Sequence, residues 1–426
     1  MTAAPGNEQQ VLSDEDLSSE ILSRLPVKSV IRCRCVCKAW RALISQPVFA
    51  KKYTSRHTKS KSSFRLLLPT FPLRSVDYEA PGIEVVFREH YYPVSLPKPE
   101  SRLDIYGSCH GLVCLAIDNY TIVLWNPSTG ESNLLPEPAL RANYPDGNFY
   151  GFGYDSTTQD YKIVRGHDFE IFPDFYFYFE VFSLKTGSWR QHPRVGPTFE
   201  LASFDDGFGG CGQGFLTNEA LHWVDINYDV ATILVFSLAE EKFGRMVPNL
   251  ESCDDLEIGI VGDCLAVYLE RRGDGGSSLW VMKEYGVEES WTKVFQFYPS
   301  GCLPTLTGPP VSSFLTQFLK FYPSGCLRTQ NYPRVRSFCL RPLCLLENGD
   351  LLLDNIHSGY THFPLYDPKT QTFRDLVQSY DPKTQKLREI DAGLWAPIMD
   401  EVTMETLVIG PTIYAETLVS PLIGSM

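Results

Sequence analysis

Five similar segments recur through the chain after residue 120. In each, a strand-like run ending in large apolar side chains leads into a short polar turn, and another large apolar or aromatic residue follows. The clearest copy is 124–131, LWNPSTGE, and the others begin at residues 181, 235, 280 and 365. An alternating run followed by an Asn/Asp-Pro-x-Thr turn is typical of a β-hairpin. A hairpin unit repeating about every 50 residues is typical of β-propeller blades of kelch-like length.

The repeat therefore predicts a mainly β fold, with a β-propeller-like domain of six or seven blades over about 360 residues. Because the copies are degenerate, a packed pair of antiparallel sheets remains an alternative. The 43% hydrophobic and 13% aromatic content supports a large core. Tyr, Phe, Val and Trp are frequent after residue 64, and these residues favour strands.

Residues 12–49 differ from the rest because they are dense in helix signals. An apolar stripe predicts a first helix that ends near Pro26, since the residue before a proline is biased away from α geometry. A second helix fits 28–33 and a third fits 35–45, with Pro47 as its stop. Three helices in about 40 residues bury too little apolar surface to be stable alone. This segment must borrow a core from the downstream domain or from another protein.

The predicted organisation is a disordered stretch at 1–11, a helical segment at 12–52, a linker with the first strands at 53–100, and a β-domain at 101–426. The sequence has no 18-residue apolar run and no secretory signal, and twelve cysteines in 426 residues are too few for a disulfide scaffold. We therefore expect reduced thiols and a cytoplasmic or nuclear location.

The net charge of −13 is unevenly distributed. Residues 24–65 hold twelve Lys or Arg and no Asp or Glu, so the remainder carries −25 (−13 minus 12). The basic run at 51–65 is interpreted as a solvated helix end and linker, with an acidic protein partner as the alternative. Nucleic acid is the least favoured partner, because the acidic remainder would repel phosphates.

The search for chemistry predicts no catalytic, metal or cofactor site. The glycine pattern at 207–212 has no helix after it to receive a phosphate, so it is interpreted as a loop. Cysteines 33, 35 and 37 lack a second Cys or His pair at zinc spacing and are interpreted as buried thiols. Cys109, Cys114 and His222 are expected to pack within strands.

Two tandem duplications interrupt the repeat. Residues 297–303 reappear at 321–327, and residues 366–371 reappear at 380–385. Neither offset matches the period of the hairpins. We interpret them as local insertions or a gene-model artefact, placed in loops, with 299–335 as the main duplicated loop.

The runs 21–29 (ILSRLPVKS) and 34–41 (RCVCKAWR) resemble the F-box of plant F-box proteins. The resemblance implies docking on a SKP-family adaptor, and through it on a cullin-based ubiquitin ligase. Two departures, Leu12-Ser13 in place of Leu-Pro and Cys33 in place of a common phenylalanine, are expected to weaken docking without abolishing it. The residues expected to bind the adaptor are Leu12, Leu17, Ile21, Leu22, Leu25, Pro26, Val30, Val36, Cys37 and Trp40.

The β-domain resembles the F-box-associated domain of the same plant family, at 107–115, 151–155, 160–164, 220–223, 258–268 and 414–421. This resemblance implies a substrate-recognition subunit whose β-domain recruits a target protein for ubiquitination, with no catalysis of its own. A glycan- or small-molecule-binding propeller is the alternative, which exposed tryptophans in one funnel would favour. A propeller enzyme would need convergent carboxylates or histidines, and a decayed gene copy is a further alternative. Trp40 has two interpretations: it packs on Leu17 and Ile21, or it contacts the adaptor.

Overall fold

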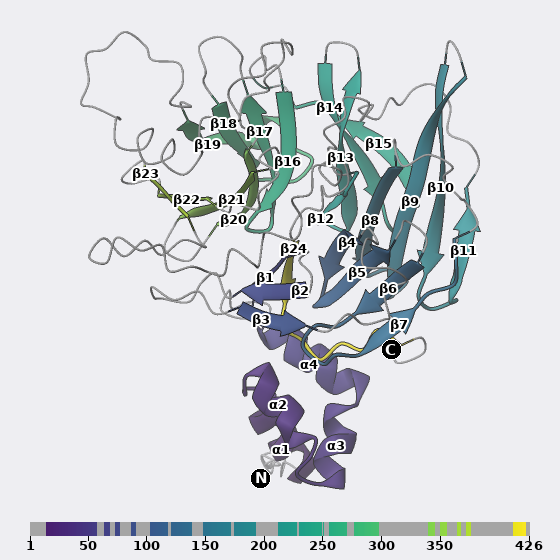
Figure 1. Cartoon of the computed structure of the whole chain (residues 1–426), viewed down its shortest axis with the longest axis vertical. Coiled ribbons are helices and arrows are strands. Elements are labelled where there is room, and N and C mark those ends of the chain that lie inside the picture. The colour runs from purple at the N-terminus through teal and green to yellow at the C-terminus, as the bar shows by residue number, and fades with distance from the viewer. Residues whose placement is uncertain are drawn as a thin grey trace, which may run out of the picture.

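The computed structural model shows a mainly β chain with a small helical segment at its N-terminal end (Figure 1). It describes residues 14–57, 64–68, 73–76, 87–90, 103–117, 121–138, 148–171, 174–192, 212–227, 230–248, 250, 255–270, 277–297, 340–345, 350–355, 364–367, 372–375 and 412–422. Within these ranges, no helix is long and apolar enough to cross a membrane.

The helical segment consists of α1 (Asp14–Leu22), α2 (Val27–Cys33), α3 (Lys38–Ile44) and α4 (Pro47–His57). The first three confirm the predicted helices. The fourth corrects the prediction, because Pro47 both follows α3 and opens α4. Proline is well suited to a first helical position, where its missing N–H would have no intrahelical partner. The helical segment therefore extends to His57, beyond the predicted boundary at residue 52.

The helices share one small apolar core, which we call the helical core. Its buried members are Leu22, Val27, Val30, Leu43, Ile44, Phe49, Ala50, Tyr53 and Leu418. Leu25, Ile31, Cys33 and Trp40 pack against it while remaining partly exposed. One member, Leu418, comes from the other end of the chain, so the segment does borrow part of its core from the downstream domain.

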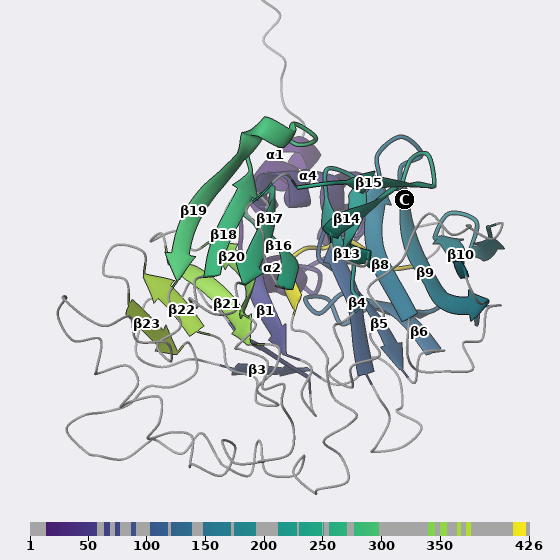
Figure 2. The ribbon, with the colours of Figure 1, turned by 90° about the horizontal axis from the view of Figure 1, so that it is seen from above.

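The strands that the structure describes form six four-stranded antiparallel sheets (Figures 1 and 2). The first combines β1 (Phe64–Leu68), β2 (Leu73–Val76) and β3 (Phe87–His90) with β24 (Thr412–Ala415). The next two are β4 (Leu103–Cys109), β5 (Leu112–Ile117), β6 (Thr121–Trp125) and β7 (Ser132–Leu134), then β8 (Asn148–Asp155), β9 (Asp160–Ile171), β10 (Asp174–Ser183) and β11 (Ser188–Gln191).

The last three sheets follow the same consecutive order. They are β12 (Phe215–Thr217), β13 (Ala220–Asn227), β14 (Val230–Ser237) and β15 (Lys242–Met246); β16 (Asp255–Val261), β17 (Cys264–Glu270), β18 (Ser277–Met282) and β19 (Trp291–Phe297); and β20 (Leu340–Leu345), β21 (Leu351–Asn355), β22 (Pro364–Asp367) and β23 (Thr372–Asp375). The 3₁₀ turn η2 (Glu288–Ser290) precedes β19.

The five repeated segments are confirmed as hairpins. Each joins the third and fourth strands of one sheet: β6 to β7, β10 to β11, β14 to β15, β18 to β19 and β22 to β23. The first sheet, β24-β1-β2-β3, has no copy of the repeat between its third and fourth strands, and its first strand, β24, comes from the C-terminal end of the chain and pairs with β1.

Neighbouring sheets contact one another mainly through their first strands. The contacts run from β24 to β4, β4 to β8, β8 to β12, β12 to β16 and β16 to β20. The buried clusters lie between these sheets, as where Tyr106 stacks on Tyr150 with 4.0 Å between ring centroids. The apolar faces of successive sheets are therefore covered by one another rather than by helices.

The structure confirms some of the smaller predictions and corrects others. Cys109 and Cys114 are buried in strands, and His222 is buried on β13. Cys35 and Cys37 are exposed and Cys33 is only partly buried, because they occupy the end of α2 and the turn before α3 rather than a helix face; the prediction of buried thiols was wrong for them. Residues 1–11, most of the 207–212 glycine pattern, both copies within 299–335 and the second copy at 380–385 lie outside the described residues.

Candidate functional site

Three large apolar side chains of the helical segment are exposed although the sequence places them among core-type residues. The exposed fraction is 45% for Leu17, 62% for Ile21 and 65% for Val36. Leu17 and Ile21 are four residues apart on α1 and therefore lie on one face of that helix. We call these three residues the exposed apolar set. Val48, at the start of α4, is 74% exposed and was missed by the sequence analysis.

The structure divides the predicted adaptor-binding residues into two kinds. Leu17, Ile21, Pro26, Val36 and Cys37 are exposed, and Leu25 and Trp40 are partly buried. Leu22 and Val30 are fully buried in the helical core, so they support the surface from beneath and cannot contact a partner in this conformation. Leu12 lies outside the described residues.

Trp40 packs against the helical core from α3, as one of its two interpretations requires. The exposed Leu17 and Ile21 are not members of that core, however, so its neighbours differ from those expected. The backbone N–H of Trp40 donates to Cys37 Sγ at 3.4 Å, and Cys37 is thereby the N-cap of α3. Trp40 is thus held against the helical core from within the segment and remains partly exposed.

An acidic residue of α1 joins the first and last helices. Glu20 accepts hydrogen bonds from Arg24 at 2.6 Å and Arg56 at 2.9 Å, and its carboxylate lies 3.0 Å from Lys52 Nζ. The hydrogen bonds from Arg24, Lys52 and Arg56 lower the pKa of Glu20 to about 2. Part of the basic run that begins at residue 51 therefore holds α4 against α1, in addition to the predicted solvation of a helix end.

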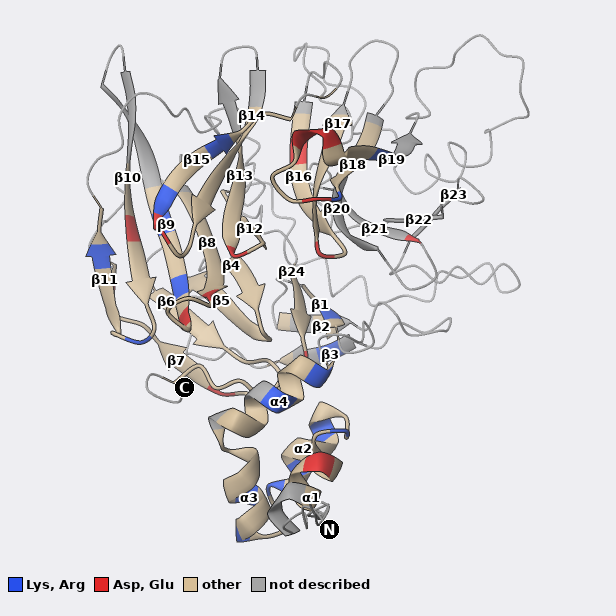
Figure 3. Cartoon of the chain, turned by 180° about the vertical axis from the view of Figure 1, so that it is seen from behind, with Lys and Arg blue, Asp and Glu red and all other residues tan. Residues whose placement is uncertain are grey.

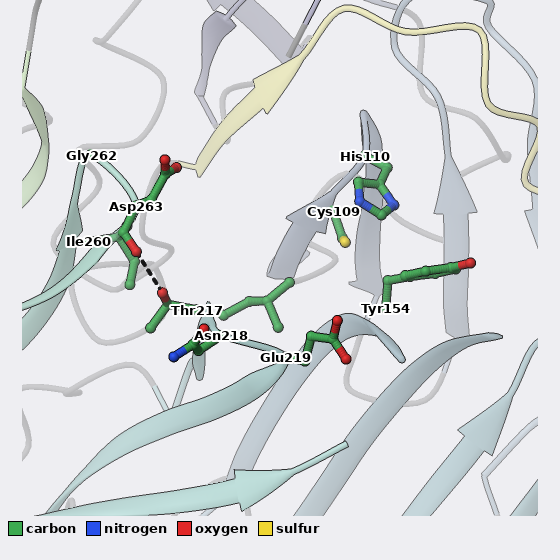
Figure 4. A pocket seen from close by; sticks show the side chains of 10 residues that line it. Cys109, His110, Tyr154, Thr217, Asn218, Glu219, Ile260, Gly262 and Asp263 are labelled. Atoms are coloured by element: carbon green, nitrogen blue, oxygen red, sulfur yellow. Dashed lines mark hydrogen bonds between the residues drawn. The ribbon is translucent and has the colours of Figure 1, made fainter. Parts of the chain in front are cut away.

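A cavity of about 350 Å³ lies in the β-domain where the first hairpins of four sheets meet (Figure 4). Its wall comes from the β4–β5, β8–β9, β12–β13 and β16–β17 ends and consists of Cys109, His110, Tyr154, Leu216, Thr217, Asn218, Glu219, Ile260, Gly262 and Asp263. Figure 4 shows His110 and Tyr154 on one side, with Glu219 below them and Asp263 opposite. The sequence analysis did not single out this cavity, since its residues are separated by more than 100 positions.

Burial shifts the pKa values of two side chains that line the cavity. Burial lowers the pKa of His110, whose Nδ1 lies 3.1 Å from the hydroxyl of Tyr161. Burial raises the pKa of Cys109 to about 12, so its thiol is not a thiolate nucleophile at neutral pH. No Lys or Arg is among the lining residues, and Glu219 and Asp263 are exposed carboxylates. The cavity can accept a polar or cationic group, but it contains no activated nucleophile.

Two further observations concern the alternatives. Each of the six tryptophans within the described ranges is buried or partly buried, so no exposed tryptophan funnel forms there. Among the same residues, no group of three or more His, Cys, Asp or Glu side chains could hold a metal ion.

Comparisons with known proteins agree with the two-part organisation. An F-box domain model matches residues 14–52, and a model described as an F-box associated beta propeller domain matches residues 71–317. The F-box protein CPR1 of Arabidopsis thaliana is 31% identical over 66% of this chain and 71% of that protein. An F-box/kelch-repeat protein of the same plant is 27% identical over 66% of this chain and 78% of its own length.

Among solved structures, an oligogalacturonate lyase in complex with manganese aligns over 82% of this chain and 83% of its own, at 10% identity and a TM-score of 0.39. The two family models match residues 14–52 and 71–317, which together make up more than half of the chain. The chain belongs to the family of plant F-box proteins that carry an F-box associated β-propeller domain.

Proposed function

We propose that this chain is a substrate-recognition subunit of an SCF-type (SKP–cullin–F-box) ubiquitin ligase. The observation that carries the proposal is the exposed apolar set, which lies on α1 and in the turn between α2 and α3, within the residues matched by the F-box model. Apolar side chains exposed on a segment with so small a core gain free energy when a partner covers them. The proposed partner is a SKP-family adaptor and, through it, a cullin.

The proposed docking uses two layers of the helical segment. Leu17, Ile21 and Val36 make the contact, together with Pro26 and the accessible edges of Leu25 and Trp40. Leu22 and Val30 hold these helices in register from the helical core. Cys37 contributes by capping α3 and so orienting Trp40.

The β-domain is proposed to be a closed propeller in which each of the six sheets is one blade and β24 completes the first. Its loops would hold a target protein, and the chain would supply proximity between target and ubiquitin-conjugating enzyme rather than an active site. The Cys109 thiol of the cavity, whose pKa is raised by burial, is not an activated nucleophile, which fits a non-catalytic role. A cytoplasmic or nuclear location is part of the same proposal.

The test is co-purification of the full chain with a plant SKP-family adaptor. An Ile21→Asp/Val36→Asp variant places two charges within the exposed apolar set and should abolish the complex. The control is Leu134→Asp, since Leu134 is 59% exposed on β7 of the β-domain and lies outside the F-box. This control should bind the adaptor as the wild type does.

Circular dichroism would establish that the wild type, the Ile21→Asp/Val36→Asp variant and the Leu134→Asp control are all folded. Failure of the folded wild type to bind the adaptor would refute the proposal. Equal losses in the helical variant and in the Leu134 control would show that the exposed apolar set is not the contact.

A further inference from the structure

The C-terminal segment, residues 416–422, lies between the helices and the β-domain (Figures 1 and 3). It directly follows β24 and contacts both the helices and the β-domain. Leu418 is buried in the helical core, whereas Val419 packs against the apolar cluster of the β4–β7 and β8–β11 sheets. Because successive side chains of an extended strand point to opposite sides, one short segment reaches both parts of the molecule.

Asn126, in the β6–β7 turn, binds this segment with its amide group. Its Nδ2 donates to the carbonyl oxygens of Thr417 at 3.1 Å and Val419 at 2.8 Å. Its Oδ1 accepts from the backbone N–H groups of Ser128 at 2.8 Å and Thr129 at 3.3 Å. Asn126 is fully buried, and all four of its hydrogen-bonding positions are used.

Sister turns within the same chain separate the two roles of Asn126. Ser183 holds the corresponding place in the β10–β11 turn, and its hydroxyl accepts from Thr186 N at 3.2 Å. Ser237 does the same in the β14–β15 turn, accepting from Glu240 N at 3.2 Å. A serine is therefore sufficient to stabilise such a turn, and the amide donors of Asn126 are an addition that only the C-terminal segment uses.

The β4–β5 turn fits closely against the same segment. The hydroxyl of Thr417, which is fully buried, donates to the carbonyl oxygen of His110 at 2.8 Å. Gly111 has φ +80°, and a Cβ added there would lie 2.1 Å from Thr417 Oγ1. Asn133 Nδ2 donates to the Pro421 carbonyl at 3.0 Å, which extends the contact along the segment.

The segment is anchored at its start by charge. Glu416 Oε1 accepts from Arg65 Nε at 2.7 Å and from Arg88 at 2.5 Å, and its carboxylate is 14% exposed. On the helical side, Arg34 pairs with Glu131 at 3.4 Å, which adds a direct contact between α2 and the β6–β7 turn. The polar contacts of Asn126, Thr417, Asn133 and Glu416 hold the segment on the β-domain. The burial of Leu418 and the Arg34–Glu131 pair join the helices to it, and these two contacts would be broken if the helices moved relative to the β-domain.

We propose that residues 416–422 act as a brace that fixes the orientation of the helical segment on the β-domain. The covalent link between the two parts runs through α4 into β1, so the brace is a second, non-covalent attachment from the far end of the chain. If the chain has the proposed function, on which this consequence rests, the brace keeps a target held by the β-domain at a constant position relative to the adaptor. Thr417, Leu418 and Asn126 are its positioning residues.

The orientation can be measured by double electron–electron resonance on the full chain. Because the chain has twelve cysteines, the two spin labels are attached to unnatural amino acids at Arg41 on α3 and Lys242 on β15, both exposed. The wild type should give one narrow distance distribution. Release of the brace should broaden it and add new distances.

Three variants separate the two sides of the brace. Asn126→Ser/Thr417→Val keeps the turn acceptor seen in the sister turns and the shape of Thr417, but removes the hydrogen bonds to the β-domain. Leu418→Ala removes the contact with the helical core. Leu422→Ala is the matched control, because it makes the same change at an exposed position of the same segment, 48% exposed.

The proposal expects broadening in the first two variants and a wild-type distribution in the Leu422 control. Unchanged distributions in both brace variants would overturn it, as would a broad distribution in the wild type. The measurement needs no adaptor, so failure of the brace is distinguished from failure of adaptor binding, which the co-purification reports. Repeating it on the adaptor complex checks that docking does not replace the brace.

Discussion

Ile21 and Leu22 are adjacent on α1, yet the structure predicts opposite effects of the same truncation. Ile21 is 62% exposed and Leu22 is 1% exposed. Full burial of such a side chain is worth about 1.5–3 kcal/mol, so covering the exposed part of Ile21 in a complex is worth roughly 1–2 kcal/mol. Ile21→Ala should therefore weaken adaptor binding by roughly 5- to 30-fold, since about 1.4 kcal/mol corresponds to tenfold in affinity.

Leu22→Ala acts on folding instead, because it leaves a cavity in the helical core. Such substitutions cost about 2–5 kcal/mol in the free energy of unfolding. Ile21→Ala should leave that free energy nearly unchanged, since an exposed side chain makes few contacts to lose. Binding is measured by isothermal titration calorimetry with a SKP-family adaptor, and unfolding by urea titration followed by circular dichroism.

The two variants serve as controls for each other. The reasoning is refuted if Ile21→Ala binds the adaptor as tightly as the wild type, because the exposed apolar set would then be unused. It is equally refuted if Leu22→Ala unfolds like the wild type but binds weakly, because Leu22 would then be a contact residue rather than a core residue.

Three further predictions follow from buried groups and tight turns. Burial lowers the pKa of His222 to about 4 from 6.5, so the unfolded chain binds more protons between these values and stability falls as the pH decreases through that window. His222→Gln should remove about 3 kcal/mol of this pH dependence in urea titrations, and an unchanged slope would contradict the assignment. Iodoacetamide should modify the exposed Cys35 on the native chain but spare Cys109, because the Cys109 thiol is buried and its pKa is raised. Mass spectrometry identifies the modified cysteines, and equal rates of modification at the two positions would contradict this prediction. Gly111→Ala should lower the unfolding temperature more than Gly130→Ala. Both glycines have positive φ, but only a Cβ at Gly111 would meet atoms of the C-terminal segment. Equal effects would show that the backbone strain, about 1–3 kcal/mol, accounts for the whole loss of stability.

The sequence predicted the hairpins well because they are local. A β-hairpin needs only an alternating run and turn residues a few positions apart, and each of the five copies supplied both. The first sheet lacks such a copy, and its pairing of β24 with β1 joins residues that are more than 300 positions apart. No periodicity within a window can report such a pairing.

The helix errors have equally local causes. Pro47 carries the same signal for the end of one helix and the start of the next, and only the packing of Phe49 and Tyr53 in the helical core shows that a helix continues. The apolar stripe in the sequence predicted which residues of α1 share one face, but it did not predict which of them are exposed. Leu17 and Ile21 differ from Leu22 only in which side of the helix faces α3 and α4.

The expectation that the helical segment must borrow a core had two possible sources, the downstream domain and another protein. The structure shows the first, because Leu418 completes the helical core from the C-terminal segment. That contribution does not cover Leu17, Ile21 or Val36, which remain exposed. The proposed adaptor would therefore contact side chains of the helical segment that the C-terminal segment leaves exposed. A brace formed by that segment can fix the orientation of the β-domain while these side chains stay free for an adaptor, which is the arrangement that a receptor joining two proteins requires.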